Sequence, residues 1–295
     1  FDNLRDASNR GSVLLEKGEG EVTELRLFNR LKQANWESMS KFYNAFLEKT
    51  DGKAEIYLYG FDEVASYLNG QVISALKNTK LAFPKIRTIS TLAHAEANPE
   101  IFGLLDIHCP TNVYAMPRFN KRTHDRVGTE YWTYIGGGGY YPFGNFERVD
   151  QPLVNSRAFL WEPIAFDHIK GFLFWDIHMW RSNNHLIGIE KVDWTKWCTT
   201  HGETNGMGAL FYPGPNATIY PSRRAHAICD GIEDYAAFKL AKAKIAALGN
   251  PAALTARLAA IRENFSTGMS VFNHDAESVQ QNRLDLYGLL DELTE

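Results

Sequence analysis

The sequence has few cysteines, no long apolar run and no cluster of one charge. Its 3 cysteines, Cys109, Cys198 and Cys229, lie far apart and form no CxxC pair. Their spacing therefore indicates neither a disulfide framework nor a zinc ribbon. No apolar stretch approaches the roughly 20 residues that cross a bilayer as a helix. The formal net charge of -4 is mild and mixed, so a nucleic-acid-binding surface, which needs clustered lysine and arginine, is not indicated.

The chain is instead rich in apolar and aromatic residues. Hydrophobic residues make up 44% of its 295 residues, which is enough for the core of one large domain or of two ordinary ones. Aromatic residues reach 13% and include 7 tryptophans. Soluble proteins rich in tryptophan and tyrosine often bind carbohydrate, although large cores use the same side chains.

Strand-like segments alternate with helical segments through most of the chain. Strands separated by helices at this rhythm indicate parallel βαβ units, and nearly continuous apolar strands indicate a sheet covered on both faces. After a helix over 21–49, we expect strands over residues 54–60, 85–91, 102–110, 130–139 and 171–180, with helices over 64–79 and 152–168. A short strand over 209–214 then precedes helices over 222–248, from 251, and over 275–293.

Polar residues gather at the C-terminal ends of these expected strands. Asp62 and Glu63 follow the first, and D-I-H strings lie in two others, at Asp106–His108 and Asp176–His178. In a (β/α)8 barrel this end of the strands carries the active site. Each string places its Asp and His on the same side of a strand. A divalent metal held by both strings is therefore an alternative to hydrogen bonding and sugar hydroxyl binding.

The adjacent acids Asp62 and Glu63 follow Gly60 and Phe61. Acids at a helix N-terminus are also a common surface feature, because they favour the positive end of the helix dipole. Neighbouring Cα atoms are only ~3.8 Å apart, whereas inverting glycosidases use carboxyl groups roughly 6.5–9.5 Å apart. The pair instead suits two acids that act on neighbouring atoms on one side of a substrate, provided that the strand stops and the chain curls at Gly60.

Aromatic residues near the strand ends are candidates for stacking on sugar rings. The four glycines 136–139 lack the pattern of a phosphate loop and predict a flexible loop that a ligand can approach closely. The aromatic candidates are Trp132, Tyr134, Tyr140, Tyr141, Trp161, Trp175 and Trp180, of which Trp132, Tyr134, Trp175 and Trp180 lie next to strand ends.

Four motifs in order carry a family resemblance. They are "IYLYGFDEV"; "EYWTYIGGGGYYPFGNF" with the following "DQPLVNSRAFLWEPIAF"; "IKGFLFWDIHMW"; and "GALFYPGPN" leading to "PSRRAHAICDGIEDYAAFKL". With these motifs the chain resembles the catalytic domain of glycoside hydrolase family 123, the β-N-acetylgalactosaminidases. The resemblance implies a (β/α)8 TIM-type barrel and retaining hydrolysis assisted by the substrate's own 2-acetamido group. Asp62 is then the acid that orients and stabilises the acetamido group, and Glu63 is the general acid/base.

The resemblance also sets the expected activity, which is exo-hydrolysis of terminal β-linked N-acetylgalactosamine without a cofactor or a metal. Three alternatives remain: a β-N-acetylglucosaminidase or other 2-acetamido-sugar hydrolase, a non-catalytic glycan-binding fragment, and a metal-dependent hydrolase. The expected substrate-binding residues are Trp132, Tyr134, Tyr140, Trp175, Asp176, His178 and Trp180.

The N-terminal part departs from the expected barrel. Family members often carry proline after the acid pair, where this chain has Val64, and residues 1–53 predict one helix but no strands. We therefore expect a barrel that lacks its first strands in this chain, completed by another chain or by a further N-terminal segment. We expect an arm over 1–20, the barrel over 21–221 and packed C-terminal helices over 222–295. The expected location is secreted, periplasmic or at the cell surface, with a cytoplasmic location left open.

Overall fold

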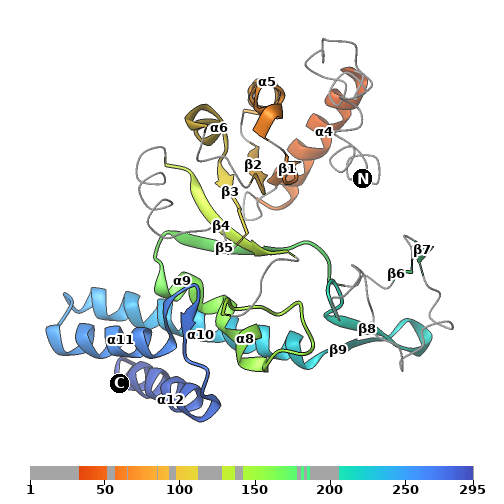
Figure 1. Cartoon of the computed structure of the whole chain (residues 1–295). Coiled ribbons are helices and arrows are strands. Elements are labelled where there is room, and N and C mark those ends of the chain that lie inside the picture. The colour runs from red at the N-terminus through yellow and green to blue at the C-terminus, as the bar shows by residue number, and fades with distance from the viewer. Residues whose placement is uncertain are drawn as a thin grey trace. The chain divides into compact units, whose positions relative to one another are not determined.

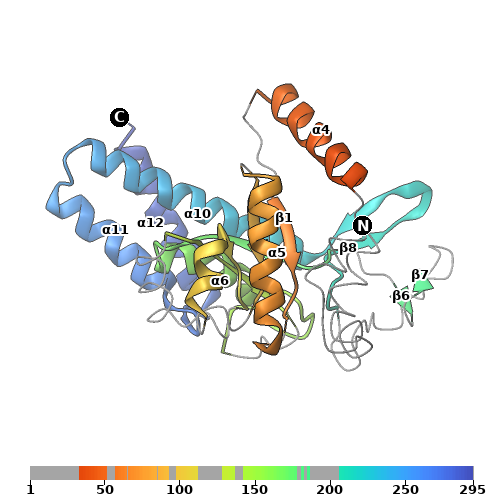
Figure 2. The same cartoon turned by 90° about the horizontal axis from the view of Figure 1, so that it is seen from above.

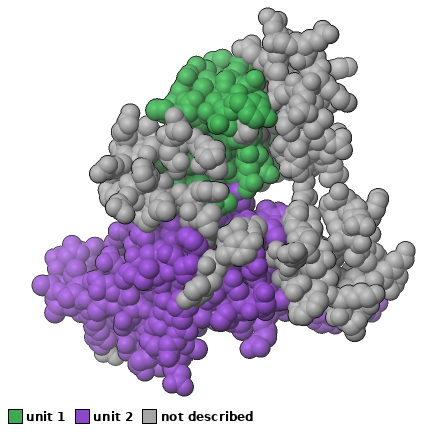
Figure 3. Space-filling model, in the orientation of Figure 1, with its two compact units in different colours: residues 1–133 green, residues 134–295 purple. Residues whose placement is uncertain are grey.

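The computed structural model divides into two compact units, residues 1–133 and residues 134–295 (Figure 3). Predictions for residues 1–32 and for Tyr140, Tyr141, His178 and Trp180 lie outside the described residues. The structure describes residues 33–51, 57–64, 66–84, 86–92, 98–111, 128–136, 142–177, 181–182, 185–186 and 206–294.

The first unit combines short parallel strands with helices (Figures 1 and 2). Strand β1 pairs with β2, β2 with β3 and β3 with β4, and all three pairings are parallel. The elements are α4 (Gln33–Lys49), β1 (Tyr57–Phe61), the 3-10 turn η1 (Ser66–Leu68), α5 (Asn69–Ala82), β2 (Arg87–Ser90), α6 (Pro99–Leu104), β3 (Ile107–His108) and β4 (Glu130–Ile135).

Strand β4 runs from the first unit into the second, where the sheet continues with β5 (Ile169–Phe174). The strand order is β1-β2-β3-β4-β5, so strands that follow one another in the chain are neighbours in the sheet. This arrangement confirms the predicted α/β class with a parallel sheet. Closure of the sheet into an eight-stranded barrel stays a prediction.

One face of the first unit's sheet lies against α6. The ring of His108 on β3 contacts Phe102 of α6 and Tyr131 of β4, with centroids 5.0 and 5.3 Å apart. All three residues are fully buried. Helices α5 and α6 lie side by side (Figures 1 and 2) and are joined at their surface by Lys77 and Glu100 over 2.6 Å.

The strand predicted over residues 102–110 is wrong in its first part. Residues 102–104 belong to α6, and only Ile107 and His108 are in strand β3. The helix begins here because the side chain of Asn98 accepts hydrogen bonds from the N–H groups of Glu100 and Ile101. Pro99 occupies the first turn, where its missing N–H costs no hydrogen bond.

The second unit is mainly helical (Figure 1). Besides β5 it contains α8 (Leu153–Ala158), η3 (Phe159–Trp161), α9 (Glu162–Ala165), β6 (Arg181–Ser182), β7 (His185–Leu186), β8 (Phe211–Pro213), η5 (Pro215–Ala217), β9 (Ile219–Pro221), α10 (Arg223–Ala247), α11 (Ala252–Phe265), β10 (Ser266–Gly268), β11 (Val271–Phe272) and α12 (Ala276–Glu292).

The C-terminal helices confirm the sequence prediction closely. Helix α10 begins after Ser222, whose hydroxyl accepts a hydrogen bond from the N–H of Ala225 over 3.1 Å. It ends before Gly249, which has the positive φ of 78° typical of a helix end. The helix predicted over 152–168 is instead divided into α8, η3 and α9.

The core of the helical layer contains Trp161, which was a candidate for sugar stacking. Its ring lies 4.8 Å from that of Phe265, and both residues are fully buried among α10, α11 and α12. Its indole N–H donates to the Asp234 carboxylate over 3.0 Å, and Arg157 donates two hydrogen bonds to the same carboxylate. Trp161 therefore belongs to the core. In the part of the chain that the structure describes, no helix is long and apolar enough to cross a membrane.

Candidate active site

The end of β1 confirms that the strand becomes irregular around Gly60. The pairing with β2 shifts register between Tyr59 and Phe61, although the strand ends at Phe61, one residue later than predicted. The carbonyl of Phe61 is held by the Ser90 hydroxyl over 2.6 Å. Glu63 then adopts a φ of 47°, a left-handed conformation that is uncommon outside glycine. This turn breaks the strand alternation that would otherwise direct Asp62 and Glu63 to opposite faces.

Two hydroxyl groups converge on the acid pair. The hydroxyls of Tyr59 and Thr91 donate to Oδ1 of Asp62 over 2.7 and 2.9 Å. The Thr91 oxygen also accepts the backbone N–H of Glu63 over 3.2 Å, and it lies 2.8 Å from the Tyr59 hydroxyl. Thr91, which is 1% exposed, thus ties the end of β2 to both acids. No hydrogen bond from the described residues reaches Oδ2 of Asp62.

Tyr59 acts as a hydrogen-bond donor in this cluster. The residue is 42% exposed, but its hydroxyl lies inward against Asp62 and Thr91. Burial of the hydroxyl and the nearby Asp62 carboxylate both raise the pKa of the phenol. The phenol therefore keeps its proton at neutral pH and donates it to Asp62. Asp62 itself is half-buried and Glu63 is exposed, so the acids differ in their access to solvent.

The candidate Trp132 lies in a second cluster of the first unit. Its indole N–H donates to Oε1 of Glu130 over 2.6 Å, and its ring lies 5.5 Å from that of Tyr57. Arg87 bonds to the other oxygen of Glu130 over 2.6 Å and lies over the Tyr57 ring. The indole of Trp132 is half-buried, so part of it is accessible. Tyr134 on the same strand is only 4% exposed, and a stacking role for it would need its surroundings to open.

The Asp and His side chains of the first D-I-H string form hydrogen bonds to other residues of the first unit. Asp106 accepts hydrogen bonds from Lys80 of α5 and from Thr88, and these outweigh partial burial and lower the pKa of its carboxyl. Nε2 of His108 lies 2.7 Å from the carbonyl of Leu92. Complete burial lowers the pKa of His108 to about 4, so the imidazole is neutral at physiological pH. Among the described residues, no group of three or more metal-ligating side chains lies together.

Trp175 and Asp176 directly follow β5 in the second unit, and both are half-buried. The indole N–H of Trp175 donates to Oε1 of Glu147 over 2.8 Å. Glu147 is fully buried, and burial raises its pKa to about 7 against the opposing effects of the Trp175 hydrogen bond and the Arg148 and Arg224 charges. Sequence reasoning missed Glu147. An acid in the aromatic and glycine-rich segment after β4 was the signal that could have found it.

Sequence reasoning also missed Tyr59 and Thr91. Tyr59 lies three residues before Asp62 inside the first expected strand, and Thr91 closes the second expected strand. A hydroxyl at the C-terminal end of a neighbouring parallel strand was the available signal, since such ends share one edge of a sheet. Whether the substrate-binding candidates and the two acids line one pocket stays a prediction.

The comparison with protein families decides the class of the protein. Residues 15–241 match the model of the glycoside hydrolase 123 catalytic domain. The chain belongs to this family. The match covers the Asp62–Glu63 pair, all five strands of the sheet and most of α10. Because the matched domain is a glycoside hydrolase catalytic domain, the family 123 protein is a glycosidase with a carbohydrate substrate. No curated protein matches the chain.

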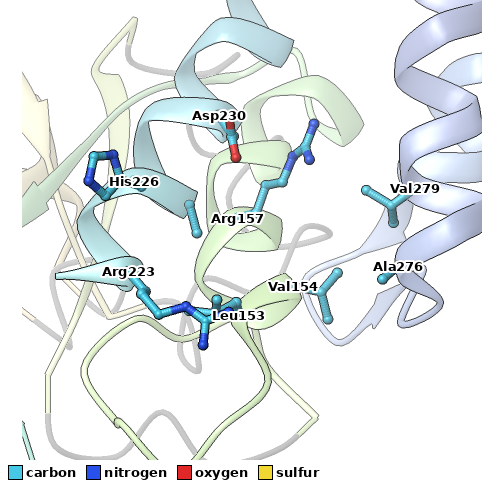
Figure 4. Close-up of a pocket in the computed structure, with 9 residues that line it drawn as sticks. Leu153, Val154, Arg157, Arg223, His226, Asp230, Ala276 and Val279 are labelled. Atoms are coloured by element: carbon cyan, nitrogen blue, oxygen red, sulfur yellow. The ribbon is translucent and has the colours of Figure 1, made fainter.

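A pocket of about 290 Å³ lies among α8, α10 and α12 of this glycosidase (Figure 4). Arg223, His226 and Asp230 line it from α10, and Arg157 lines it from α8. Two of its charged groups form contacts within the helical layer, because Arg157 bonds to the buried Asp234 and Asp230 accepts a hydrogen bond from Arg283 over 3.2 Å. Neither predicted catalytic acid lines this pocket.

Proposed function

We propose that this family 123 glycosidase removes terminal β-linked N-acetylgalactosamine with retention of configuration, using the substrate's 2-acetamido group as the nucleophile. The observation that carries the proposal is the fixed orientation of Asp62. Two hydroxyl donors hold its Oδ1, while Oδ2 receives no hydrogen bond from the described residues. That oxygen is suited to accept the acetamido N–H.

In the first step the acetamido oxygen attacks the anomeric carbon as the glycosidic bond breaks. The Asp62 carboxylate accepts the acetamido N–H and stabilises the positive charge that develops on the oxazolinium-like intermediate. Glu63, in its protonated form, donates its proton to the departing oxygen. Because the acetamido group and the leaving oxygen are neighbours on one sugar, two adjacent acids reach both.

In the second step Glu63 acts as a base. Its carboxylate takes a proton from water, and the water oxygen attacks the anomeric carbon from the face that the leaving group occupied. The bond to the acetamido oxygen breaks, and the intermediate opens to N-acetylgalactosamine of unchanged anomeric configuration. Positive φ at Glu63 supports this assignment, because strained backbone conformations cluster at functional sites.

A panel of nitrophenyl glycosides tests the proposal. We expect release of nitrophenol from the β-N-acetylgalactosaminide and no release from the β-galactoside, because the latter lacks the nucleophile. The β-N-acetylglucosaminide, which differs at one hydroxyl, measures sugar preference. Steady cleavage of the simple β-galactoside would overturn the assisted mechanism. Cleavage of the glucosaminide in preference to the galactosaminide would overturn the substrate assignment.

A further inference from the structure

The loop that carries Glu147 is firmly anchored in the second unit. The ring of Phe146 packs against Phe159 and Phe174, with centroids 5.2 and 4.6 Å apart. Gly144 has no room for a side chain, since a Cβ there would lie 2.8 Å from the backbone nitrogen of Phe159. The side-chain oxygen of Asn145 accepts the N–H of Glu147 over 2.6 Å. These contacts fix the position from which the Glu147 side chain projects.

Arg224 in the first turn of α10 also holds this loop, through hydrogen bonds to its backbone carbonyls. Its Nη1 donates to the carbonyls of Phe146 and Glu147 over 2.8 and 2.6 Å, and to that of Gly206 over 3.0 Å. Its Nη2 donates to the carbonyl of Ala209 over 2.6 Å. The guanidinium is buried, so these charge-assisted bonds act in a weakly screened environment. One side chain thus joins α10, the Glu147 loop and the segment before β8.

The anchored loop presents one carboxylate to one indole. Oε1 of Glu147 accepts the Trp175 N–H over 2.8 Å, while Oε2 is buried and reaches no partner among the described residues. We propose that Glu147 is a positioning residue that fixes the Trp175 indole for stacking on the sugar ring. The proposal rests on the proposed glycosidase function. In it, Glu147 does not touch the substrate but acts on it through the Trp175 side chain.

The physical reason is preorganisation. A tryptophan just beyond a strand end can adopt several rotamers, and ordering it on binding costs free energy. A buried acceptor at the indole nitrogen selects one rotamer before the sugar arrives. The acceptor cannot easily move, because Asn145 and Arg224 hold its backbone. The charged groups that face Glu147 are Arg148 and Arg224.

The first experiment observes the indole directly in the full chain. Nitrogen-15 labelled tryptophan gives an indole N–H resonance for Trp175, identified by its loss in Trp175→Phe. We expect this resonance to shift with a midpoint near pH 7 in the wild type, following the ionisation of Glu147, and to stay constant in Glu147→Gln. Glu147→Gln keeps an acceptor oxygen but cannot ionise. A resonance that ignores pH in the wild type, or that titrates equally in Glu147→Gln, would overturn the contact.

The second experiment measures the consequence for the substrate, using whichever nitrophenyl 2-acetamido glycoside the enzyme cleaves. We expect Glu147→Leu, which removes the acceptor, to raise KM about tenfold with little change in kcat. Glu147→Gln should stay close to the wild type. In a Trp175→Phe background, Glu147→Leu should add no further increase, because the residue acts through the indole. An equal increase in both backgrounds would contradict a positioning role.

The two experiments separate this inference from the proposed function. An enzyme inert on every 2-acetamido glycoside refutes the proposed function, while the indole resonance still tests whether Glu147 holds Trp175. If Glu147→Leu does not fold, the wild type and Glu147→Gln decide the contact by titration. The Trp175→Phe variant then tests the substrate role, and an unchanged KM in that variant would overturn it.

Discussion

The Thr91 hydroxyl donates to Oδ1 of Asp62 over 2.9 Å from the neighbouring strand. The same oxygen accepts the N–H of Glu63, so one threonine at the end of β2 orients both acids that follow β1. Parallel pairing of β1 with β2 brings these residues together, although 28 and 29 positions separate them in the chain. The orientation of the proposed catalytic pair is therefore a property of the sheet.

Thr91→Val should lower kcat/KM by about tenfold or more. Valine has nearly the same shape, but it removes a hydrogen bond to a charged acceptor, a contact worth about 1.5–3 kcal/mol. Steady-state kinetics on the nitrophenyl substrate measures the loss. Thr91→Ser keeps the hydroxyl and should retain most activity. If valine and serine gave the same kinetics, Thr91 would have no role in orienting Asp62.

Asp62→Asn and Glu63→Gln should differ in their dependence on the leaving group. Glu63→Gln removes the proton donor, so poor leaving groups should suffer most, while activated aryl glycosides need little protonation. Asp62→Asn weakens the acetamido nucleophile and should reduce activity on both classes. Rates on aryl glycosides of increasing leaving-group pKa provide the measurement. A wild-type-like Asp62→Asn enzyme would show that the assigned mechanism is wrong.

Much of the secondary structure could be predicted from the sequence, and so could the position of the acid pair just after β1. The catalytic role of the pair stays a prediction. Apolar and aromatic runs locate β1 and β4, and helical periodicity locates the C-terminal helices, each of which buries one side. The apolar run around Phe102 fits a strand or a helix equally well, and only the Asn98 cap decides for α6. The sequence also could not show that Trp161 is fully buried whereas Trp175 is only half-buried. Both are tryptophans near apolar segments, and the partners that bury Trp161 include residues of α10, α11 and α12, far along the chain.

The supporting residues of the site needed the structure for a different reason. Tyr59 and Thr91 matter through the register between β1 and β2, which fixes which side chains meet. Glu147 matters because Trp175, 28 positions away, supplies its hydrogen bond. Sequence spacing does not specify such contacts, because loops of variable length separate the partners.

Glu63→Gly should leave stability within about 1 kcal/mol of the wild type while it abolishes activity on substrates with poor leaving groups. A left-handed φ of 47° costs a non-glycine residue about 1–2 kcal/mol, and glycine avoids this cost at the expense of a more flexible unfolded chain. Glu63→Val should be clearly less stable, since a β-branched side chain tolerates this conformation poorly. Thermal unfolding of the three proteins makes the comparison. Equal losses for glycine and valine would mean that the left-handed turn is not maintained.

Two buried groups should make stability depend on pH with opposite signs. Burial raises the pKa of Glu147 from 4.5 to about 7, so between these values the native state holds a proton that the unfolded chain has released, and stability falls as pH rises. Burial lowers the pKa of His108 from 6.5 to about 4, so over nearly the same window stability rises with pH. The wild-type profile therefore contains two opposing contributions, and a variant is needed to isolate the first.

Glu147→Gln should gain stability relative to the wild type as pH rises from 4.5 to 7. The difference between the two proteins should grow by on the order of 3 kcal/mol, because only the wild type must ionise a buried carboxyl. Urea unfolding at several pH values measures this difference, in which the His108 contribution cancels. Trp175→Phe removes a donor that stabilises the ionised carboxylate, so Glu147 should then resist ionisation further and the fall in stability should extend to higher pH. A difference that stays constant with pH would show that folding does not raise the pKa of Glu147. The buried contact between Glu147 and Trp175 would then lose its physical basis.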